Sequence, residues 1–138
     1  MQKYIQNNLI RSILIVFVAN TLALFFHWYR LLWWFDMPMH FMGGFFCVWL
    51  VLYINNKFFT KNKGNDSIVL NRYLIKNALV WAFIIGLGWE WFEWGADLYT
   101  GAMSMHMIDS YSDLFFDMAG AFSAIFMLKY KYESRKQE

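Results

Sequence analysis

Four long apolar stretches alternate with short polar segments along the chain. The apolar stretches cover about residues 9–28, 37–55, 74–94 and 111–130, and each is close to the roughly 20 residues that a helix needs to cross a bilayer. Lipid offers no partner to open backbone groups, so spans of this kind must be helices. The pattern predicts an all-α fold, a four-transmembrane-helix bundle that forms a single integral membrane domain over residues 1–138.

The segments between the stretches read as loops and tails. Residues 57–72 contain the run Lys61-Asn62-Lys63-Gly64-Asn65-Asp66 and have no apolar period, so they are expected to form a loop. Residues 131–138 are polar and are expected to form a frayed tail. Gly95 directly follows the third stretch, where it is expected to cap that helix.

Lysine and arginine are distributed unevenly among these segments. Five lie within residues 57–76, four within 129–136 and two in the N-terminal arm, which leaves only Arg30 for the other two connections. Basic residues accumulate in cytoplasmic segments, so both termini and the 57–72 loop are expected in the cytoplasm. Six tryptophans near the opposite ends fit an interfacial belt, although they could also be core filler: Trp28, Trp33, Trp34, Trp89, Trp91 and Trp94.

Composition agrees with a lipid environment and excludes several other classes of protein. Hydrophobic residues make up 59% of the chain and charged residues 16%, whereas soluble domains carry about 25% charged residues. The formal net charge of +2 and the lack of a basic stripe argue against nucleic acid as a partner. The single cysteine, Cys47, excludes a disulfide within the chain.

Most acidic residues and all three histidines fall toward the outer ends of the spans. A rise of about 1.5 Å per residue puts Asp117 about 18 Å from Lys129 on its own span, whereas the hydrocarbon core is about 30 Å thick. Asp117 is therefore expected inside the membrane, and Asp113 with it. The outer set comprises Asp36, Glu90, Glu93, Asp97, Asp109, Asp113 and Asp117, together with His27, His40 and His106.

Three pairs in this set lie three or four residues apart and so share a helix face: Asp36 with His40, Glu90 with Glu93, and Asp113 with Asp117. An ionisable group at the bilayer centre costs about 2.5–3.5 kcal/mol, so these groups should face inward. Shared protons, a bound metal or a water-filled cavity would each let the carboxylates coexist. Carboxylates with an imidazole suit Zn, Mn or non-haem Fe, and an all-oxygen set would suit Mg or Ca.

Plainer roles exist for part of the set. Asp36 and Asp113 could cap their helices, Asp97 and Asp109 could be loop acids, and His27 and His106 could be interfacial. Glu90 and Glu93 fall near the end of a helix where the dipole disfavours negative charge. The candidate metal ligands are therefore His40, Glu90, Glu93, Asp113 and Asp117, with Asp36 as a further candidate, and the candidate catalytic residues are Glu90, Glu93 and Asp117.

Small residues accompany these polar positions. Gly43 and Gly44 follow His40, Gly86 and Gly88 precede the glutamates, and Gly120 follows Asp117. Small side chains let helix backbones approach closely, so these positions are expected at helix contacts.

The ordered motifs resemble those of a known family. Asp36-Met37-Pro38-Met39-His40 with Gly43-Gly44, then Trp89-Glu90-Trp91-Phe92-Glu93, then Asp113-x-x-x-Asp117-x-x-Gly120 resemble VanZ-like membrane proteins, and more closely the related YjdF-type proteins. VanZ-like chains usually have Lys, Gln and Asn where this chain has Met37, Glu93 and Asp117, so this site is more acidic. The resemblance covers roughly residues 33–121 and implies a multi-pass protein of the bacterial inner membrane.

Three classes of function follow. A membrane enzyme would use a divalent cation and carboxylates that act as acid and base on a lipid or lipid-linked substrate of the cell envelope. A non-catalytic accessory would use the polar cluster to fix helix packing. A proton or metal-ion transporter would need a path through the cytoplasmic halves of the spans, which carry almost no ionisable groups, and a homo-oligomer could create one.

Overall fold

The described residues of the computed structural model, 1–59, 72–100, 107–135 and 137, are almost entirely helical and include no strand. The predicted all-α class is confirmed for this part of the chain. A short helix that the apolar pattern did not predict lies between the first two long ones. The helices are α1 (Gln2–Phe25), α2 (Trp28–Leu31), α3 (Asp36–Phe59), α4 (Arg72–Thr100) and α5 (Met107–Ser134).

Three of the helices, α1, α3 and α5, are long and apolar enough to cross a membrane. Helix α4 is longer than any of them but contains two glutamates and three tryptophans within six residues, which lower its hydropathy. Large apolar side chains such as Phe17, Trp91 and Phe126 are exposed around the bundle, and a surface of this kind requires lipid or protein to cover it. Exposure of Trp33, Trp34, Trp89, Trp91 and Trp94 excludes core filler as their role.

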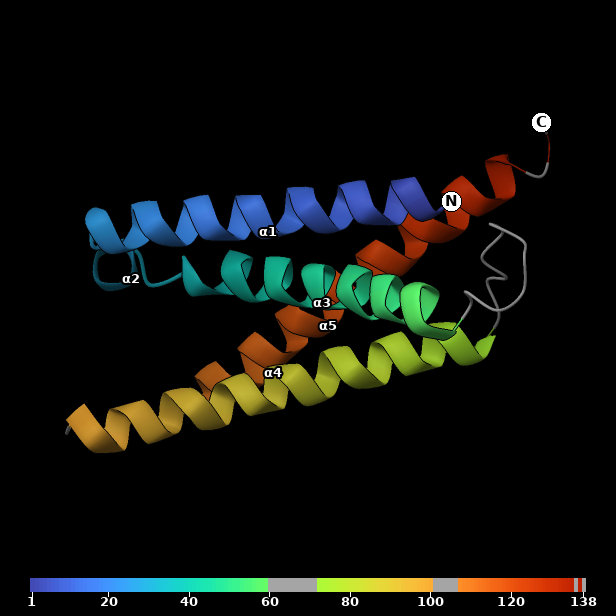
Figure 1. The fold of residues 1–138 in the computed structure, drawn as a ribbon. Coiled ribbons are helices and arrows are strands. Elements are labelled where there is room, and N and C mark those ends of the chain that lie inside the picture. The colour runs from blue at the N-terminus through green and yellow to red at the C-terminus, as the bar shows by residue number, and fades with distance from the viewer. Residues whose placement is uncertain (60–71, 101–106, 136, 138) are drawn as a thin grey trace.

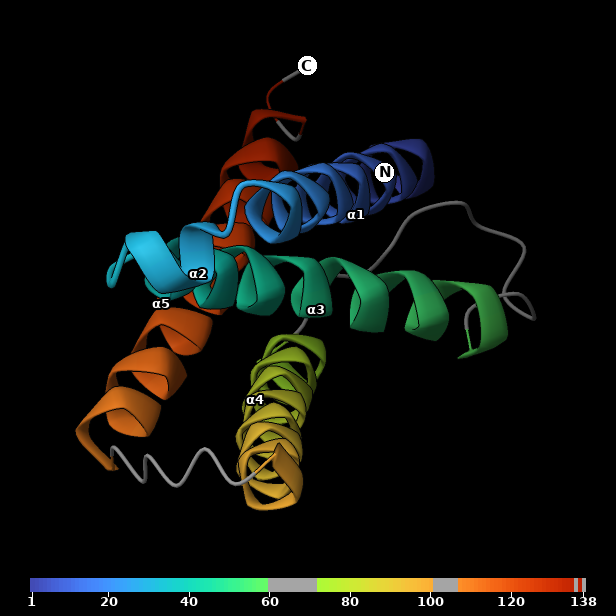
Figure 2. The ribbon, with the colours of Figure 1, turned by 90° about the vertical axis from the view of Figure 1, so that its left-hand side faces the viewer.

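Helix α3 is the central element, because it contacts α1, α4 and α5 and packs most extensively on α5. Helices α1 and α4 lie on different sides of α3, and α5 crosses behind it (Figures 1 and 2). The two ends of the chain lie at the same end of the bundle (Figure 1). We call this the terminal end, and the other the α2 end.

The crossing of α3 and α5 depends on two glycines. A Cβ atom on Gly44 would collide with the backbone of Asp117, and one on Gly120 would collide with the backbone of Phe41. A Cβ on Gly88 would meet open space. Close helix packing is thus confirmed for Gly44 and Gly120, whereas the same expectation for Gly88 is wrong.

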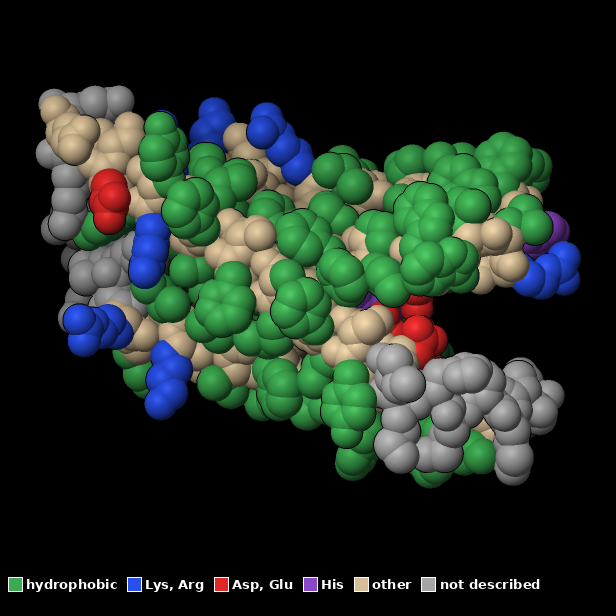
Figure 3. All heavy atoms as spheres, turned by 180° about the vertical axis from the view of Figure 1, so that it is seen from behind, with side chains coloured by type: hydrophobic (Ala, Val, Ile, Leu, Met, Phe, Trp, Pro, Cys, Tyr) green, Lys and Arg blue, Asp and Glu red, His purple; other side chains and the backbone are tan. Residues whose placement is uncertain are grey.

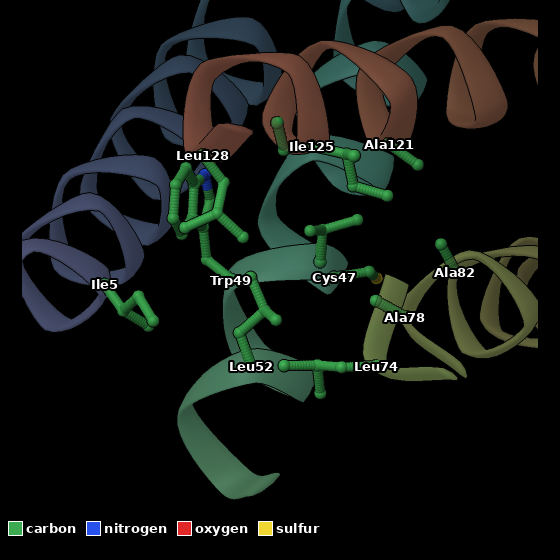
Figure 4. Packing of buried hydrophobic residues seen from close by; sticks show 12 residues of the cluster. Ile5, Cys47, Trp49, Leu52, Leu74, Ala78, Ala82, Ala121, Ile125 and Leu128 are labelled. Atoms are coloured by element: carbon green, nitrogen blue, oxygen red, sulfur yellow. The ribbon is translucent and has the colours of Figure 1, made fainter. Parts of the chain in front are cut away.

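Apolar side chains fill the half of the bundle nearer the terminal end. Trp49 and Leu52 of α3 and Leu128 of α5 are almost fully buried there, beside Ala78 of α4 and Ile5 of α1 (Figure 4). The alanines of α4 and α5 in this cluster let the helices approach, while the large side chains of α3 fill the space between them. The buried acidic and histidine side chains of the described residues, His40, Asp113 and Asp117, lie outside this apolar core.

Several local expectations require correction. Helix α4 continues through Gly95 to Thr100, so Gly95 does not cap it. Asp97 lies within α4, and Asp109 lies in the first turn of α5 rather than in a loop. Asp113 is too far inside α5 to cap it.

The predicted loop and tail are also shorter than expected. Helix α3 continues to Phe59 and α5 to Ser134. The rest of the predicted loop, residues 60–71, and His106 lie outside the described residues.

Candidate metal centre

His40 lies at the centre of a cluster of ionisable side chains from three helices. It projects from α3 one turn after Asp36, with α4 supplying Glu90 and α5 supplying Asp117. Only 5% of the His40 surface is exposed. An imidazole buried this deeply in a membrane protein must satisfy its two nitrogens within the protein.

The Nδ1 side of the ring faces Asp117. The distance from His40 Nδ1 to Asp117 Oδ2 is 3.4 Å, and Asp117 is itself 5% exposed. Gly86 makes room for this carboxylate, whereas a side chain on Gly43 would only touch it at an ordinary contact distance. A Cβ on Gly86 would lie 2.5 Å from Asp117 Oδ2, and a Cβ on Gly43 would lie 3.6 Å from Oδ1.

The Nε2 side of the ring is buried without a hydrogen-bond partner. It lies 3.7 Å from Asp36 Oδ2 and 4.0 Å from Glu90 Oε1, and Glu90 Oε1 is also buried without a partner. Leaving such groups unpaired costs about 1–3 kcal/mol each. Zinc bonds of about 2.0–2.2 Å would place two ligands roughly 3–4 Å apart, so the gap has the width that a shared cation requires.

Two groups of three potential ligands share His40. One combines it with Asp36 and Glu93, the other with Glu90 and Asp113, and in each group the ligand atoms lie within 4.8 Å of one another. Asp113 is 3% exposed. The structure therefore brings together all six residues that the sequence nominated: Asp36, His40, Glu90, Glu93, Asp113 and Asp117.

Glu93 is oriented from its own helix, because the indole Nε1 of Trp89 donates a hydrogen bond of 2.8 Å to its Oε1. Two of the other outer residues, His27 and Asp109, belong to neither group of potential ligands. His27 is exposed and has a left-handed backbone (φ 57°) where α2 begins. Asp109 is also exposed.

A cavity of about 560 Å³ adjoins the cluster. Its walls come from the long helices α1, α3, α4 and α5 and from Tyr29 of the short helix α2. They include Asp36, His40, Glu93 and Asp117. In Figure 3, Asp and Glu side chains gather in a recess toward one end of the molecule, while most Lys and Arg side chains lie at the other end. The acidic recess and most of the basic side chains therefore lie toward opposite ends of the molecule in this view.

The contribution of α1 and Tyr29 to this cavity was not predicted. Asn20 of α1 lines it and accepts a hydrogen bond of 2.8 Å from the Tyr29 hydroxyl. Partial burial raises the pKa of Tyr29, and the negative charges of Asp36 and Glu93 raise it further. The available sequence signal was Asn20 itself, a polar residue in the middle of an apolar stretch.

Comparison with known families gives a match over nearly the whole chain. Residues 2–134 match a family described as "Predicted membrane protein (DUF2238)". No curated protein and no solved structure matches the chain. The matched range includes the five helices and the six residues of the cluster.

Proposed function

Because the chain belongs to the DUF2238 family of predicted membrane proteins, we propose that it is a multi-pass inner-membrane protein that binds a divalent cation at the cluster around His40. The observation that carries the proposal is the different surroundings of the two nitrogens of the His40 imidazole. Its Nδ1 faces the Asp117 carboxylate, while its buried Nε2 lacks a partner and faces Asp36 and Glu90.

This arrangement matches the way histidine binds metals. A metal-bound imidazole usually passes its other N–H to a carboxylate, which fixes the ring and its tautomer. Asp117 then acts as the positioning residue for His40, and the cation lies on the Nε2 side. One of two groups would supply the oxygen ligands, either Glu90 with Asp113 or Asp36 with Glu93. One imidazole among carboxylates favours Zn, Mn or Fe(II).

The proposal includes four spans, with α4 as the fourth and the α2 end facing outward. The concentration of Lys and Arg toward the terminal end supports this orientation. A membrane-impermeant maleimide applied to intact cells tests it, since Cys47 is buried. Trp33→Cys should react and Glu133→Cys should not. The opposite pattern would invert the topology.

The centre is proposed to act on a lipid or lipid-linked substrate of the cell envelope, because the cluster lies toward the outer ends of the helices, where lipid headgroups are found. The cation would polarise an oxygen of the substrate, and a carboxylate that is not a ligand, Glu90 or Glu93, would serve as acid or base. The apolar core around Trp49 argues against the transport alternative, because the side chains that form this cluster in the described residues are hydrophobic.

Metal analysis tests the cation site and separates it from the accessory alternative. The protein is purified without chelator, reconstituted with Mn²⁺, Zn²⁺ or Fe²⁺, and assayed for bound metal alongside His40→Gln, Asp113→Asn and Asp109→Asn. Asp109 is a matched control, because it is exposed one turn before Asp113 on α5. The proposal expects metal near one ion per chain, lost in His40→Gln and kept in Asp109→Asn. Loss in Asp113→Asn as well would identify the group of Glu90 and Asp113 as the ligands.

Absence of bound metal from the wild-type protein under all three conditions would overturn the cation site. If His40→Gln and Asp113→Asn then also lowered the unfolding temperature, the cluster would hold the helices together. That result would support the non-catalytic accessory.

A further inference from the structure

We infer that the cavity beside the cluster binds a phosphorylated amphiphile, whose phosphate meets the cation and whose hydrocarbon chain follows the apolar walls. The inference rests on the proposed cation site and names the class of its substrate. The cavity volume of about 560 Å³ falls within the roughly 300–1,000 Å³ of ordinary ligand pockets.

The walls of the cavity change from polar to apolar along the helix axes. At the α2 end lie Asp36, Tyr29 and Glu93, whereas toward the middle of the bundle lie Phe46 and Ala82. An outer-leaflet lipid has the same polarity, with its headgroup at the membrane surface and its chain toward the midplane. A ligand of this kind could occupy the cavity in the orientation that it already has in the bilayer.

One side of the cavity is bounded by helices that do not pack against each other. Val16 and Asn20 of α1 and Ile85 of α4 contribute to the walls, yet α1 and α4 both pack on α3 and share no substantial contact. Figure 2 shows α1 and α4 on different sides of α3. In a bilayer the space between them adjoins lipid chains, which gives an amphiphile a lateral entrance.

The charges of the cluster determine which headgroup can bind. The cavity wall includes three carboxylates, Asp36, Glu93 and Asp117, and no lysine or arginine among the described residues. Without a cation these carboxylates would repel a phosphate at close range. Phosphate binding should therefore depend on the divalent ion, which would bridge the carboxylates and the phosphate oxygens.

The test compares two valines of α1 that face opposite ways. Val16 lines the cavity, whereas Val18 is 52% exposed on the outer surface of the helix. Full-length protein in nanodiscs loaded with Mn²⁺ is titrated with palmitoyl lysophosphatidate, with palmitoyl monoacylglycerol and with inorganic phosphate. Val16→Trp should fill the cavity and weaken lysophosphatidate binding by about tenfold or more, while Val18→Trp should leave it unchanged.

Three results would overturn the inference while leaving the cation site intact. These are equal affinity of Val16→Trp and Val18→Trp for lysophosphatidate, equal affinity of the wild type for the monoacylglycerol, and phosphate binding as tight as that of lysophosphatidate. Removal of Mn²⁺ with chelator should abolish lysophosphatidate binding, and retained binding would also refute the inference. If Val16→Trp does not fold, the same comparison is made with Ile85→Trp and the exposed neighbour Ile84→Trp.

Failure of the proposed function would give a different result, because the wild-type protein would then bind no Mn²⁺ even before any lipid is added. The metal assay therefore precedes the lipid titration, and each result is assigned to one of the two proposals.

Discussion

Gly86 of α4 leaves the space that the Asp117 carboxylate occupies, so adding one methyl group there should disturb the metal centre more than the fold. The Cβ of Gly86→Ala would lie 2.5 Å from Asp117 Oδ2, about 1 Å inside an ordinary contact of roughly 3.5 Å. Gly88 lies two residues later on the same helix, and a Cβ there would meet open space. Gly88→Ala is therefore the matched control.

The carboxylate has little room to escape the new methyl group. Oδ2 is already 3.4 Å from His40 Nδ1, and Asp117 as a whole is only 5% exposed. A shift of about 1 Å away from the methyl group would move Oδ2 relative to the imidazole and release the ring. Losing a carboxylate partner of a metal-bound histidine costs about 10–100-fold in metal affinity.

The expected loss of stability in Gly86→Ala is small, because the gain from replacing a helical glycine partly offsets the cost of overpacking. Replacing glycine by alanine within a helix contributes about 0.5–1 kcal/mol, while overpacking costs about 1–3 kcal/mol. The free energy of unfolding of Gly86→Ala should therefore change by about 0 to −2.5 kcal/mol, whereas Gly88→Ala should gain about 0.5–1 kcal/mol.

Two measurements on the same samples check this reasoning. Titration with Mn²⁺ or Zn²⁺ gives the metal Kd, and unfolding in mixed micelles gives the stability. The reasoning is refuted if Gly86→Ala and Gly88→Ala bind metal equally tightly. Equal stability of the two variants would show that the Asp117 carboxylate lies farther from Gly86 than in the structure.

Three further outcomes are expected. Asp117→Asn keeps an oxygen acceptor for the imidazole and should bind metal more tightly than Asp117→Ala, for which about 10–100-fold loss is expected, as metal titration would show. Gly120→Ala should cost about 3 kcal/mol, because its methyl group would meet the backbone of Phe41; chemical unfolding in micelles measures this loss. Asp36→Asn removes a negative charge that raises the pKa of Tyr29, so the pKa of Tyr29 should fall in this variant, and a bound cation should lower it in the wild type. An ultraviolet pH titration measures this pKa, with Tyr29→Phe as the reference that lacks the Tyr29 signal.

The helical class could be predicted because lipid allows few alternatives for long apolar stretches. Helix ends were harder to predict. Gly95 and the polar residues around it suggested a stop, yet α4 continues to Thr100. Beyond a bilayer core the backbone can remain helical in water, so the end of an apolar stretch does not determine the end of the helix.

The members of the cluster could be predicted because each is costly in lipid and lies one turn from another. Their roles could not, because roles depend on which atoms face each other across helices. Nothing in the spacing distinguishes Asp117, which faces His40 Nδ1, from Glu90, which faces Nε2. The Tyr29–Asn20 wall of the cavity was missed for a similar reason, since it forms between α2 and α1 through the turn at His27.

The packing of α3 on α5 and the chemistry of the centre are linked through the same residues. Asp117 is one turn before Gly120 on α5, and its backbone occupies the space left by Gly44. A short aspartate side chain can reach His40 only because the two helices approach this closely. A glutamate at this position would extend one methylene further into a site already bounded by Gly43 and Gly86. The glycines therefore determine both where α5 crosses α3 and which carboxylate can hold the imidazole, so changes at the crossing should alter metal affinity before they unfold the bundle.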